Sequence, residues 1–259
     1  MLGHSGSGHR PVSAAVAAAC LFSRPYRHAC GIGLREYRTG ESMTTNNGSA
    51  VAGWDRMGLY SQYLLPRLIH FSMGQAQLLP YRRRVVAGAR GRILELGIGS
   101  GRNLPFYGEA VEEIIGIDPS REILALAQPA LGVISRKVTL LPQSAESLPL
   151  EGRSIDTVVV TWSLCSIPDP GAALREARRV LKPDGQLRFV EHGLAPDPSV
   201  RKWQRRLTPL WSYCAGGCCL DRKMDNLIQA AGFQIGDLAI GYARGPRFAA
   251  YMYEGSAKP

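Results

Sequence analysis

A glycine-rich turn directly after a short apolar run constrains this chain more than any other feature of its sequence. Arg92 to Asn103 reads RILELGIGSGRN, with glycines at the alternate positions 97, 99 and 101. Glycine reaches positive φ without a steric penalty and lets a ligand lie close against the backbone. A turn of this kind between a strand and a helix is typical of nucleotide-binding sheets. Tight turns also use glycine for steric reasons alone, so the motif by itself is weak evidence for a ligand-binding site.

Strand-like and helix-like segments alternate along the chain around this turn. Strands are predicted over 92–96, 112–118, 137–141, 154–162 and 186–192, and helices over 119–128 and 169–185. The tail adds a basic amphipathic segment at 200–212, a helix at 221–231, and strand-like runs at 234–242 and 247–255. This alternation predicts an α/β fold, a doubly wound, mostly parallel sheet with helices on both faces.

Charge and cysteine content bear on partners and compartment. The net charge is +10, but the basic residues are scattered and the densest run is YRRR at 81–84, which favours a solvated basic surface. The six cysteines form no C-x-x-C pair, and adjacent Cys218 and Cys219 suit reduced thiols, which predicts a cytoplasmic location. The apolar stretch 13–22 is shorter than the roughly 18–20 residues of a membrane helix. Peripheral contact with an anionic membrane stays open.

Polar residues at the ends of two further predicted strands strengthen the evidence for a ligand site at the glycine turn. Asp118 ends the predicted second strand, where a carboxylate could accept hydrogen bonds from both hydroxyls of a ribose. Ser144, Ala145 and Glu146 follow the third strand, where they would line an adenine. Arg102 stands where a dinucleotide fingerprint has its third glycine, and the chain has no P-loop motif, so a bound pyrophosphate is not indicated. S-adenosylmethionine, which carries adenosine and a methionine tail but no phosphate, fits these features.

Several segments together resemble class I S-adenosylmethionine-dependent methyltransferases over about residues 90–254. They are ELGIGSGRNLPFY, Asp118, QSAESLPL, SIDTVVVTWSLCSI and ARRVLKPDGQLRFVEH. LCSIPDP, EHG and GGCCLDR look like the small-thiol methyltransferases of the methyltransferase-like group and their bacterial relatives. The resemblance implies a seven-stranded Rossmann-like fold and S-adenosyl-L-methionine as cofactor. The implied cofactor-binding residues are Glu95, Gly97, Gly99, Gly101, Asn103, Asp118, Pro119, Ser144, Ala145, Glu146 and Ser163. Many relatives have Asp where Ser144 stands, which puts that adenine contact in doubt.

The same reading divides the chain into two parts. Residues 1–50 lack a sustained hydrophobic period and are expected to be disordered, a targeting peptide, or an extension ahead of a working start at Met43. Residues 51–259 are expected to form a single domain. Its parts would be a helical cap at 51–89 with Pro66 as a break, a cofactor-binding core at 90–195, and an acceptor-side segment with the final strands at 196–259.

The acceptor pocket is expected beyond the fourth strand. Its loop lacks the [DN]-P-P-[YF] motif of DNA amine methyltransferases and the paired glutamates of arginine methyltransferases. The expected pocket residues are Trp162, Leu164 and Cys165 from this loop, with Trp203 and Trp211 from an apolar stripe that also contains Leu207 and Leu210. This stripe would cover the pocket, or else rest on anionic lipid.

His192 ends the fifth strand and is the candidate catalytic base, because an unperturbed histidine titrates near neutral pH; a structural role is equally open. His192 with Cys218 and Cys219 suggests metal ligands, but adjacent cysteines suit one tetrahedral site poorly, so no metal is expected.

These features favour methyl transfer to a small-molecule acceptor, foremost a thiol. The alternative acceptor is a phospholipid headgroup or another small amine. A nucleic-acid-modifying or nucleic-acid-binding protein is less well supported, because no aromatic-studded basic motif accompanies the charge, and no stable nucleic-acid partner is expected. A cofactor-binding relative without catalysis is disfavoured by the intact glycine turn and Asp118.

Overall fold

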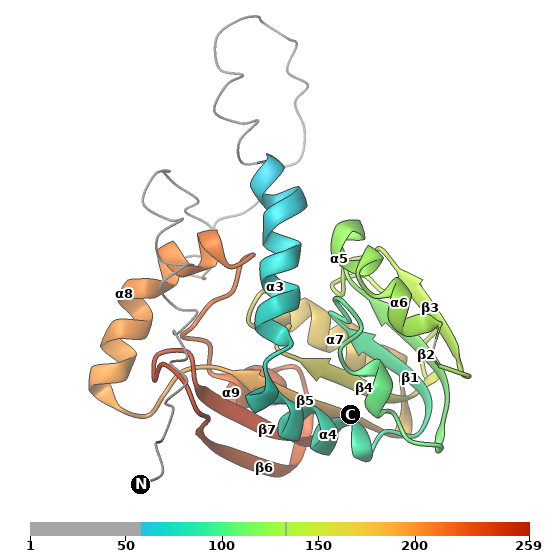
Figure 1. Ribbon diagram of the computed structural model, residues 1–259. Coiled ribbons are helices and arrows are strands. Elements are labelled where there is room, and N and C mark those ends of the chain that lie inside the picture. The colour runs from blue at the N-terminus through green and yellow to red at the C-terminus, as the bar shows by residue number, and fades with distance from the viewer. Residues whose placement is uncertain (1–57, 133) are drawn as a thin grey trace, which may run out of the picture.

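The computed structural model describes residues 58–132 and 134–259, arranged around one seven-stranded sheet (Figure 1). The strand order is β3-β2-β1-β4-β5-β7-β6. The strands are β1 (Gly91–Leu96), β2 (Val111–Ile117), β3 (Lys137–Leu141), β4 (Ile155–Thr161), β5 (Leu181–His192), β6 (Gln234–Tyr242) and β7 (Tyr251–Lys258). β1 to β5 run parallel, and β7 is antiparallel to both of its neighbours. The predicted mostly parallel, doubly wound sheet of seven strands is confirmed.

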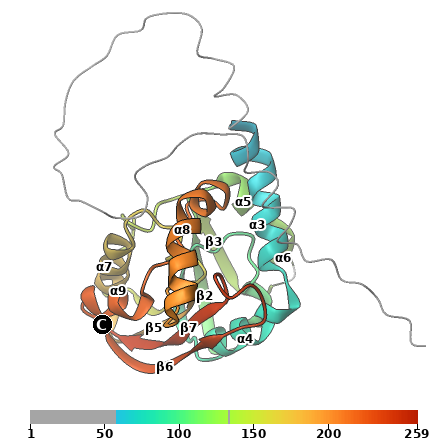
Figure 2. The ribbon, with the colours of Figure 1, turned by 90° about the vertical axis from the view of Figure 1, so that its left-hand side faces the viewer.

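The helices lie on both sides of this sheet, with α7 and α9 on one side and α4 on the other (Figures 1 and 2). They are η1 (Tyr60–Leu64), α3 (Leu65–Met73), η2 (Ala76–Leu78), α4 (Leu79–Ala87), η3 (Leu104–Phe106), α5 (Arg121–Ala125), α6 (Gln128–Leu131), α7 (Pro170–Val180), α8 (Pro198–Cys214) and α9 (Met224–Ala230). Within the described residues, none of these combines the length and the apolarity that crossing a bilayer requires.

Two hydrophobic cores follow from the alternation of side chains along the strands. Leu94 and Leu96 of β1 belong to the core under α7 and α9, whereas Ile93, next to Leu94, belongs to the core under α4. Successive residues of a strand point to opposite faces, so a strand covered on both sides is apolar at nearly every position. This is why residues 93–96, ILEL, are apolar at every position except Glu95.

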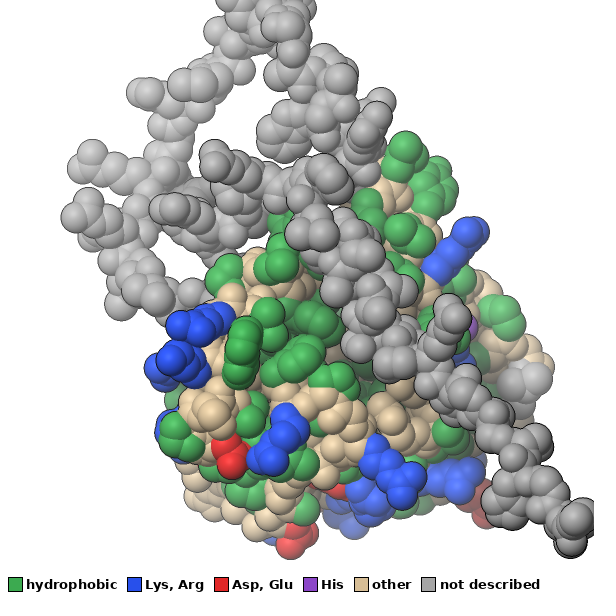
Figure 3. All heavy atoms as spheres, turned by 60° about the vertical axis from the view of Figure 1, so that its left-hand side comes forward, with side chains coloured by type: hydrophobic (Ala, Val, Ile, Leu, Met, Phe, Trp, Pro, Cys, Tyr) green, Lys and Arg blue, Asp and Glu red, His purple; other side chains and the backbone are tan. Residues whose placement is uncertain are grey.

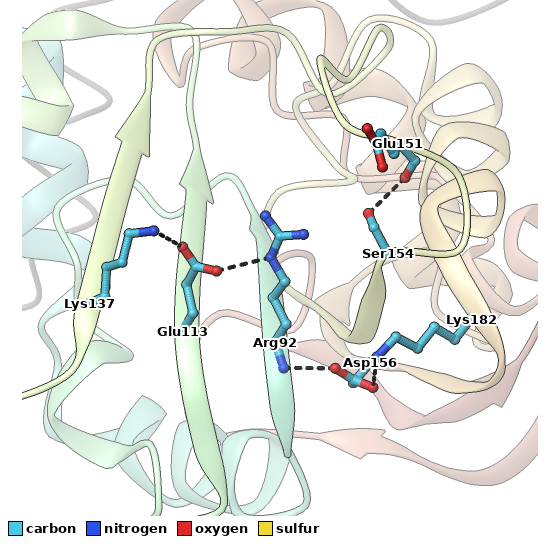
Figure 4. A network of polar contacts seen from close by, with 7 residues as sticks. All are labelled: Arg92, Glu113, Lys137, Glu151, Ser154, Asp156 and Lys182. Atoms are coloured by element: carbon cyan, nitrogen blue, oxygen red, sulfur yellow. Dashed lines mark hydrogen bonds and ion pairs between the residues drawn. The ribbon is translucent and has the colours of Figure 1, made fainter.

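A chain of charged side chains crosses the amino ends of the parallel strands (Figure 4). The Glu113 carboxylate bonds Lys137 Nζ at 2.7 Å and Arg92 Nε at 3.0 Å. The Asp156 carboxylate accepts from the Arg92 backbone N–H at 2.9 Å and from Lys182 Nζ at 2.7 Å. Surface ion pairs of this kind add little stability, but they favour one alignment of neighbouring strands. The opposite, carboxyl ends of the strands are left for the cavity described below.

Three local expectations differ from the structure. Pro66, predicted as a break or kink, does not end the first helix; it follows directly on the π-helical turn η1, so the helix is irregular there and ends at Met73. The helix predicted to reach 185 ends at Val180, because Leu181 is already extended and begins β5. Cys219 is disulfide-bonded, so of the adjacent pair only Cys218 is the free thiol that was expected.

Helix α8 buries a different face from the predicted apolar stripe. Its buried residues are Val200, Gln204, Thr208 and Cys214, whereas Trp203 is 57% exposed and Leu210 47%. Gln204 can be buried because its amide is satisfied: it accepts from the Ala195 N–H at 3.0 Å and donates to the Gly193 carbonyl at 2.9 Å. The predictions for residues 1–50 and the start at Met43 fall outside the described residues.

Candidate functional site

A cavity of about 300 Å³ opens at the carboxyl ends of β1, β2 and β4. The predicted site residues on its wall are Gly97, Gly99, Asp118, Pro119, Ser144, Ala145, Trp162 and Ser163. Helix α3 covers it with apolar side chains, namely Leu65, Pro66, Ile69 and Met73. The structure therefore brings the ends of three strands that are distant in the sequence to one pocket, as expected of an open α/β sheet.

The three alternate glycines of the turn serve two different purposes. All three have positive φ, +67° at Gly97, +55° at Gly99 and +71° at Gly101. A Cβ at Gly97 would lie 2.2 Å from Ser163 Oγ, and one at Gly101 would lie 2.8 Å from Leu104 Cδ1, so these two allow close packing inside the protein. A Cβ at Gly99 would meet no protein atom nearer than 3.9 Å. The backbone at Gly99 therefore faces space that a ligand can fill.

Asp118 is held at the mouth of this turn by backbone hydrogen bonds. Its Oδ2 accepts from the Gly99 N–H at 3.2 Å and its Oδ1 from the Ser120 N–H at 2.9 Å. Burial raises the pKa of Asp118, and these two hydrogen bonds act against the rise by favouring the carboxylate. A fixed carboxylate on the cavity wall is suited to accept from hydroxyl groups of a ligand.

Glu95 and Asn103 lie behind the turn rather than on the cavity wall. Asn103 Nδ2 donates to Glu95 Oε1 at 2.7 Å, and the Tyr107 hydroxyl donates to Glu95 Oε2 at 2.7 Å. Arg82 completes the network by donating from Nη1 to Asn103 Oδ1 at 2.7 Å. Burial raises the pKa of Glu95 to about 7. These residues fix the shape of the turn from below.

Glu146 and Gly101 also lie off the cavity wall. The Glu146 carboxylate accepts from the Ser144 hydroxyl at 2.8 Å and from the Asp169 N–H at 2.7 Å, which ties the loop after β3 to the start of α7. Glu146 thus positions Ser144, which is itself on the wall.

Two arginines on the wall, Arg82 and Arg102, were not among the predicted site residues. Arg102 Nη2 lies 2.7 Å from His70 Nε2 and donates to the His70 carbonyl at 3.0 Å, which fastens α3 to the turn. Arg82 is 4% exposed, and burial lowers its pKa to about 10, so it remains a cation at neutral pH. The sequence shows Arg102 at the position where a dinucleotide-binding motif has a glycine. Its contacts with His70 of α3 are seen only in the structure.

Trp162 is held in an uncommon backbone conformation beside the cavity. Its φ is +50°, which costs a bulky L-residue about 1–2 kcal/mol. Its backbone N–H donates to the Val190 carbonyl at 2.9 Å, and its ring lies under the Arg82 guanidinium at 4.8 Å and edge-on to Tyr81. Its buried indole Nε1 has no acceptor among the described residues. Strained residues with unsatisfied polar atoms concentrate at functional sites.

The remaining predicted residues lie off this wall. His192 Nε2 lies 3.1 Å from Cys218 Sγ, and Cys165, His192 and Cys218 bring one ligand atom each to within 4.8 Å of one another. Leu164 is fully buried in the core under α7, and Trp203 is exposed on α8. Trp211 donates from Nε1 to Cys218 Sγ at 3.3 Å. None of these six residues is on the cavity wall that the described residues form.

The buried thiols and the carboxylate beside them influence one another. The hydrogen bond from Cys218 lowers the pKa of the Cys165 thiol, and the same interaction raises that of Cys218. Burial raises the pKa of Glu191 well above its usual range, and the negative charge of Cys165 adds to the rise. Cys165 is therefore the member of the pair that carries the negative charge first.

Residues 94–189 match the family described as "Methyltransferase domain". The chain is similar to this family over that segment. The segment runs from the middle of β1 through β4 and most of β5, and it contains every predicted cofactor-binding residue.

Two curated proteins are similar to part of this chain. "Thiol S-methyltransferase TMT1B" of Homo sapiens is 33% identical over 144 residues, which cover 53% of this chain and 59% of that protein. "Phosphatidylethanolamine N-methyltransferase" of Cereibacter sphaeroides is 32% identical over 126 residues, which cover 47% of this chain and 62% of that protein. The matched region thus spans less than two thirds of either relative.

A solved structure shares the fold. The crystal structure of a "SAM dependent methyltransferase from Aquifex aeolicus" has a TM-score of 0.52 and 19% sequence identity, and the match covers 74% of this chain and 97% of that chain. The chain therefore shares the fold of that solved structure.

Proposed function

We propose that the protein transfers a methyl group from S-adenosyl-L-methionine to a small-molecule thiol. The cofactor, when bound, supplies an electrophilic methyl group on a sulfonium. The turn at 97–101 and Asp118 would hold its methionine and ribose parts, and Ser144 with Ala145 would line its adenine. Two observations support this fit. No protein atom fills the space in front of Gly99. The carboxylate of Asp118 is held on the cavity wall by its hydrogen bond from the Gly99 N–H.

The charge of the cavity wall is the observation that carries the choice of acceptor. Among the described wall residues, Asp118 is the one acid, and Arg82 and Arg102 are the bases. With Asp118 assigned to the ribose, no carboxylate remains to hold a cationic amine. A thiol becomes nucleophilic as its thiolate, and nearby guanidinium groups favour that anion.

The protein's own contribution is positioning and exclusion of water. The apolar side chains of α3 close the cavity over the acceptor, and Arg102 fastens that helix by its contacts with His70. Holding a nucleophile in line with an electrophile supplies much of the acceleration in such a displacement. His192 as a base stays a prediction, and its Nε2 faces Cys218 rather than the cavity.

A panel of acceptors tests this function. Purified protein with labelled S-adenosylmethionine should methylate small alkyl thiols faster than matched alkylamines, with product identified by mass spectrometry. The rate should rise with pH as the acceptor thiol ionises. Methylation of amines, phosphatidylethanolamine or RNA with no thiol turnover would contradict the acceptor assignment.

Peripheral contact with an anionic membrane is a second proposal, supported by the exposed face of α8. Figure 3 shows hydrophobic side chains gathered on this side of the molecule, with Lys and Arg side chains around them. Trp203 is 57% exposed, and Lys202, Arg205 and Arg206 are exposed beside it. A helix with an exposed tryptophan among basic residues is suited to lie in a lipid interface. Such contact would also present a lipid amine, the alternative acceptor.

A further inference from the structure

Two cysteines and a histidine from three separate elements meet behind the cavity. Cys165 follows β4, His192 ends β5, and Cys218 lies in the loop between α8 and α9. We propose that these three side chains bind one divalent cation of the zinc class and leave a fourth position for the thiolate of the acceptor. The second half of this proposal rests on the proposed thiol acceptor, and the first half does not.

The spacing of the three ligand atoms suits such a cation. His192 Nε2 and Cys218 Sγ are 3.1 Å apart, and the ligand atoms of all three residues lie within 4.8 Å of one another. Zinc binds thiolate sulfur at about 2.3 Å and imidazole nitrogen at about 2.0–2.1 Å, which places neighbouring ligands of a tetrahedron about 3.5–3.8 Å apart. The shortest distance is a few tenths of an ångström below that value and no pair exceeds 4.8 Å, so side-chain shifts of up to about 1 Å complete the site.

The site is assembled by the backbone of the fold. Glu191 Oε1 accepts from the N–H groups of Ser163 and Leu164 at 2.6 and 2.9 Å, which joins the end of β5 to the loop of Cys165. The Cys219 N–H donates to the Cys165 carbonyl at 2.8 Å, which joins the loop of Cys218 to the same segment. The ligands are therefore brought together without a cation, and binding one costs little ordering entropy.

Both sulfur atoms have a polar neighbour of the kind found around metal thiolates. Trp211 Nε1 donates to Cys218 Sγ at 3.3 Å, and Ser166 Oγ lies 3.5 Å from Cys165 Sγ. Partners of this kind orient ligands and tune a metal site.

A buried carboxyl group and a guanidinium lie beside the cluster. Glu191 is fully buried, and its Oε2 has no hydrogen-bond partner among the described residues. Arg222 donates to the carbonyls of Leu164 and Ile167, on either side of Cys165. These hydrogen bonds fix the backbone of the loop that carries Cys165.

The fourth position would face the acceptor. Ser163, Ser166 and Gly216 lie on the cavity wall, within two residues of Cys165 or Cys218 along the chain. Three protein ligands with one open position are typical of catalytic rather than structural zinc. On binding there, the acceptor's S–H bond breaks, its proton passes to solvent, and a sulfur–metal bond forms. In this arrangement His192 is a ligand, so its Nε2 cannot also act as a base.

Metal analysis of the whole chain tests the site without any cofactor. Purified protein in a phosphine reductant would be loaded with zinc, freed of excess by gel filtration, and analysed by mass spectrometry. About one zinc per chain is expected. Cys165→Ser, His192→Asn and Cys218→Ser should each weaken zinc binding more than about 100-fold, since even the outer partners of ligands are worth roughly 10–100-fold. His70→Asn, which changes a histidine outside the cluster, is the matched control and should keep the metal.

Circular dichroism of each metal-free variant establishes that it folds. In the wild-type protein, zinc should also protect Cys165 and Cys218 from alkylation, as read by peptide mass mapping, which needs no variant. Absence of stoichiometric zinc, lack of this protection, or equal loss in ligand and control variants would each overturn the site.

Cobalt substitution tests the open position. The cobalt-loaded protein should show sulfur-to-metal charge-transfer absorption from two thiolates, which should grow by about half when 2-mercaptoethanol supplies a third. A spectrum unchanged by thiol would mean a closed site and overturn the acceptor half of the proposal. If cobalt binds thiol but no thiol is methylated, the metal site stands and the proposed function fails.

Discussion

Asn103 Nδ2 donates a 2.7 Å hydrogen bond to Glu95 Oε1 in the interior of the protein, directly behind the glycine turn. Both side chains are buried, and the Tyr107 hydroxyl donates to the other carboxylate oxygen of Glu95. Burial nevertheless outweighs these two hydrogen bonds and raises the pKa of Glu95 to about 7. The glycine turn thus packs against a buried carboxyl group whose charge changes near neutral pH.

Stability should therefore fall as the pH rises from 4.5 to about 7. Over this window the unfolded chain has released the Glu95 proton while the native protein retains it, so the native state loses its advantage as the pH rises through the folded pKa. The loss from this group is about 3 kcal/mol, at about 1.4 kcal/mol per pH unit. Urea unfolding across this range should show a decline that Glu95→Gln flattens, whereas Glu112→Gln, on an exposed residue, should leave it unchanged. Equal slopes in all three proteins would contradict the buried-carboxyl assignment.

Asp118→Ala should weaken the binding of S-adenosylmethionine by about 1.5–3 kcal/mol, or roughly 10- to 150-fold, because a charge-assisted hydrogen bond to ribose is lost. Isothermal titration calorimetry measures this directly. Asp184→Asn, which removes an exposed carboxylate, is the control and should bind like the wild type. Unchanged affinity in Asp118→Ala would mean that the ribose lies elsewhere.

Substitutions at two glycines of the turn should separate packing from binding. Gly97→Ala places a methyl group 2.2 Å from Ser163 Oγ, so it should lower the melting temperature clearly, and Ser163→Gly in the same chain should restore part of the loss.

Gly99→Ala places a methyl group that meets no protein atom nearer than 3.9 Å, so it should cost only the backbone strain, about 1–2 kcal/mol. Because its methyl group occupies the ligand's space, Gly99→Ala should impair cofactor binding more than stability. Thermal melting with and without cofactor measures both, and a Gly99→Ala protein with normal affinity would contradict the placement of the cofactor.

Binding to anionic vesicles should depend on the exposed face of α8. The double variant Lys202→Gln/Arg206→Gln should weaken sedimentation with phosphatidylserine-containing vesicles about 30-fold, from about 1 kcal/mol for each basic residue near the surface. Trp203→Ser should weaken it further by removing the interfacial ring. Arg121→Gln/Arg175→Gln removes the same charge from α5 and α7 and is the control. Equal losses in both double variants would indicate a general charge effect, and no binding by the wild type would contradict membrane contact.

The sequence by itself determined the parts of this protein that depend on local periodicity and turn chemistry. The apolar run before Gly97, the alternation of strands and helices, and the position of Asp118 after β2 follow from dihedral preferences and burial patterns within a few residues. The tertiary structure alone decided which distant segments meet. Arg102 fastens α3 through His70, and Gln204 rather than Trp203 is buried on α8, because both outcomes depend on hydrogen-bond partners far away in the chain. Cys165, His192 and Cys218 likewise converge only because β4 and β5 are neighbours in the sheet and the loop after α8 returns to them. No spacing along the sequence encodes that convergence, since the distances between the side chains are set by the order of the strands.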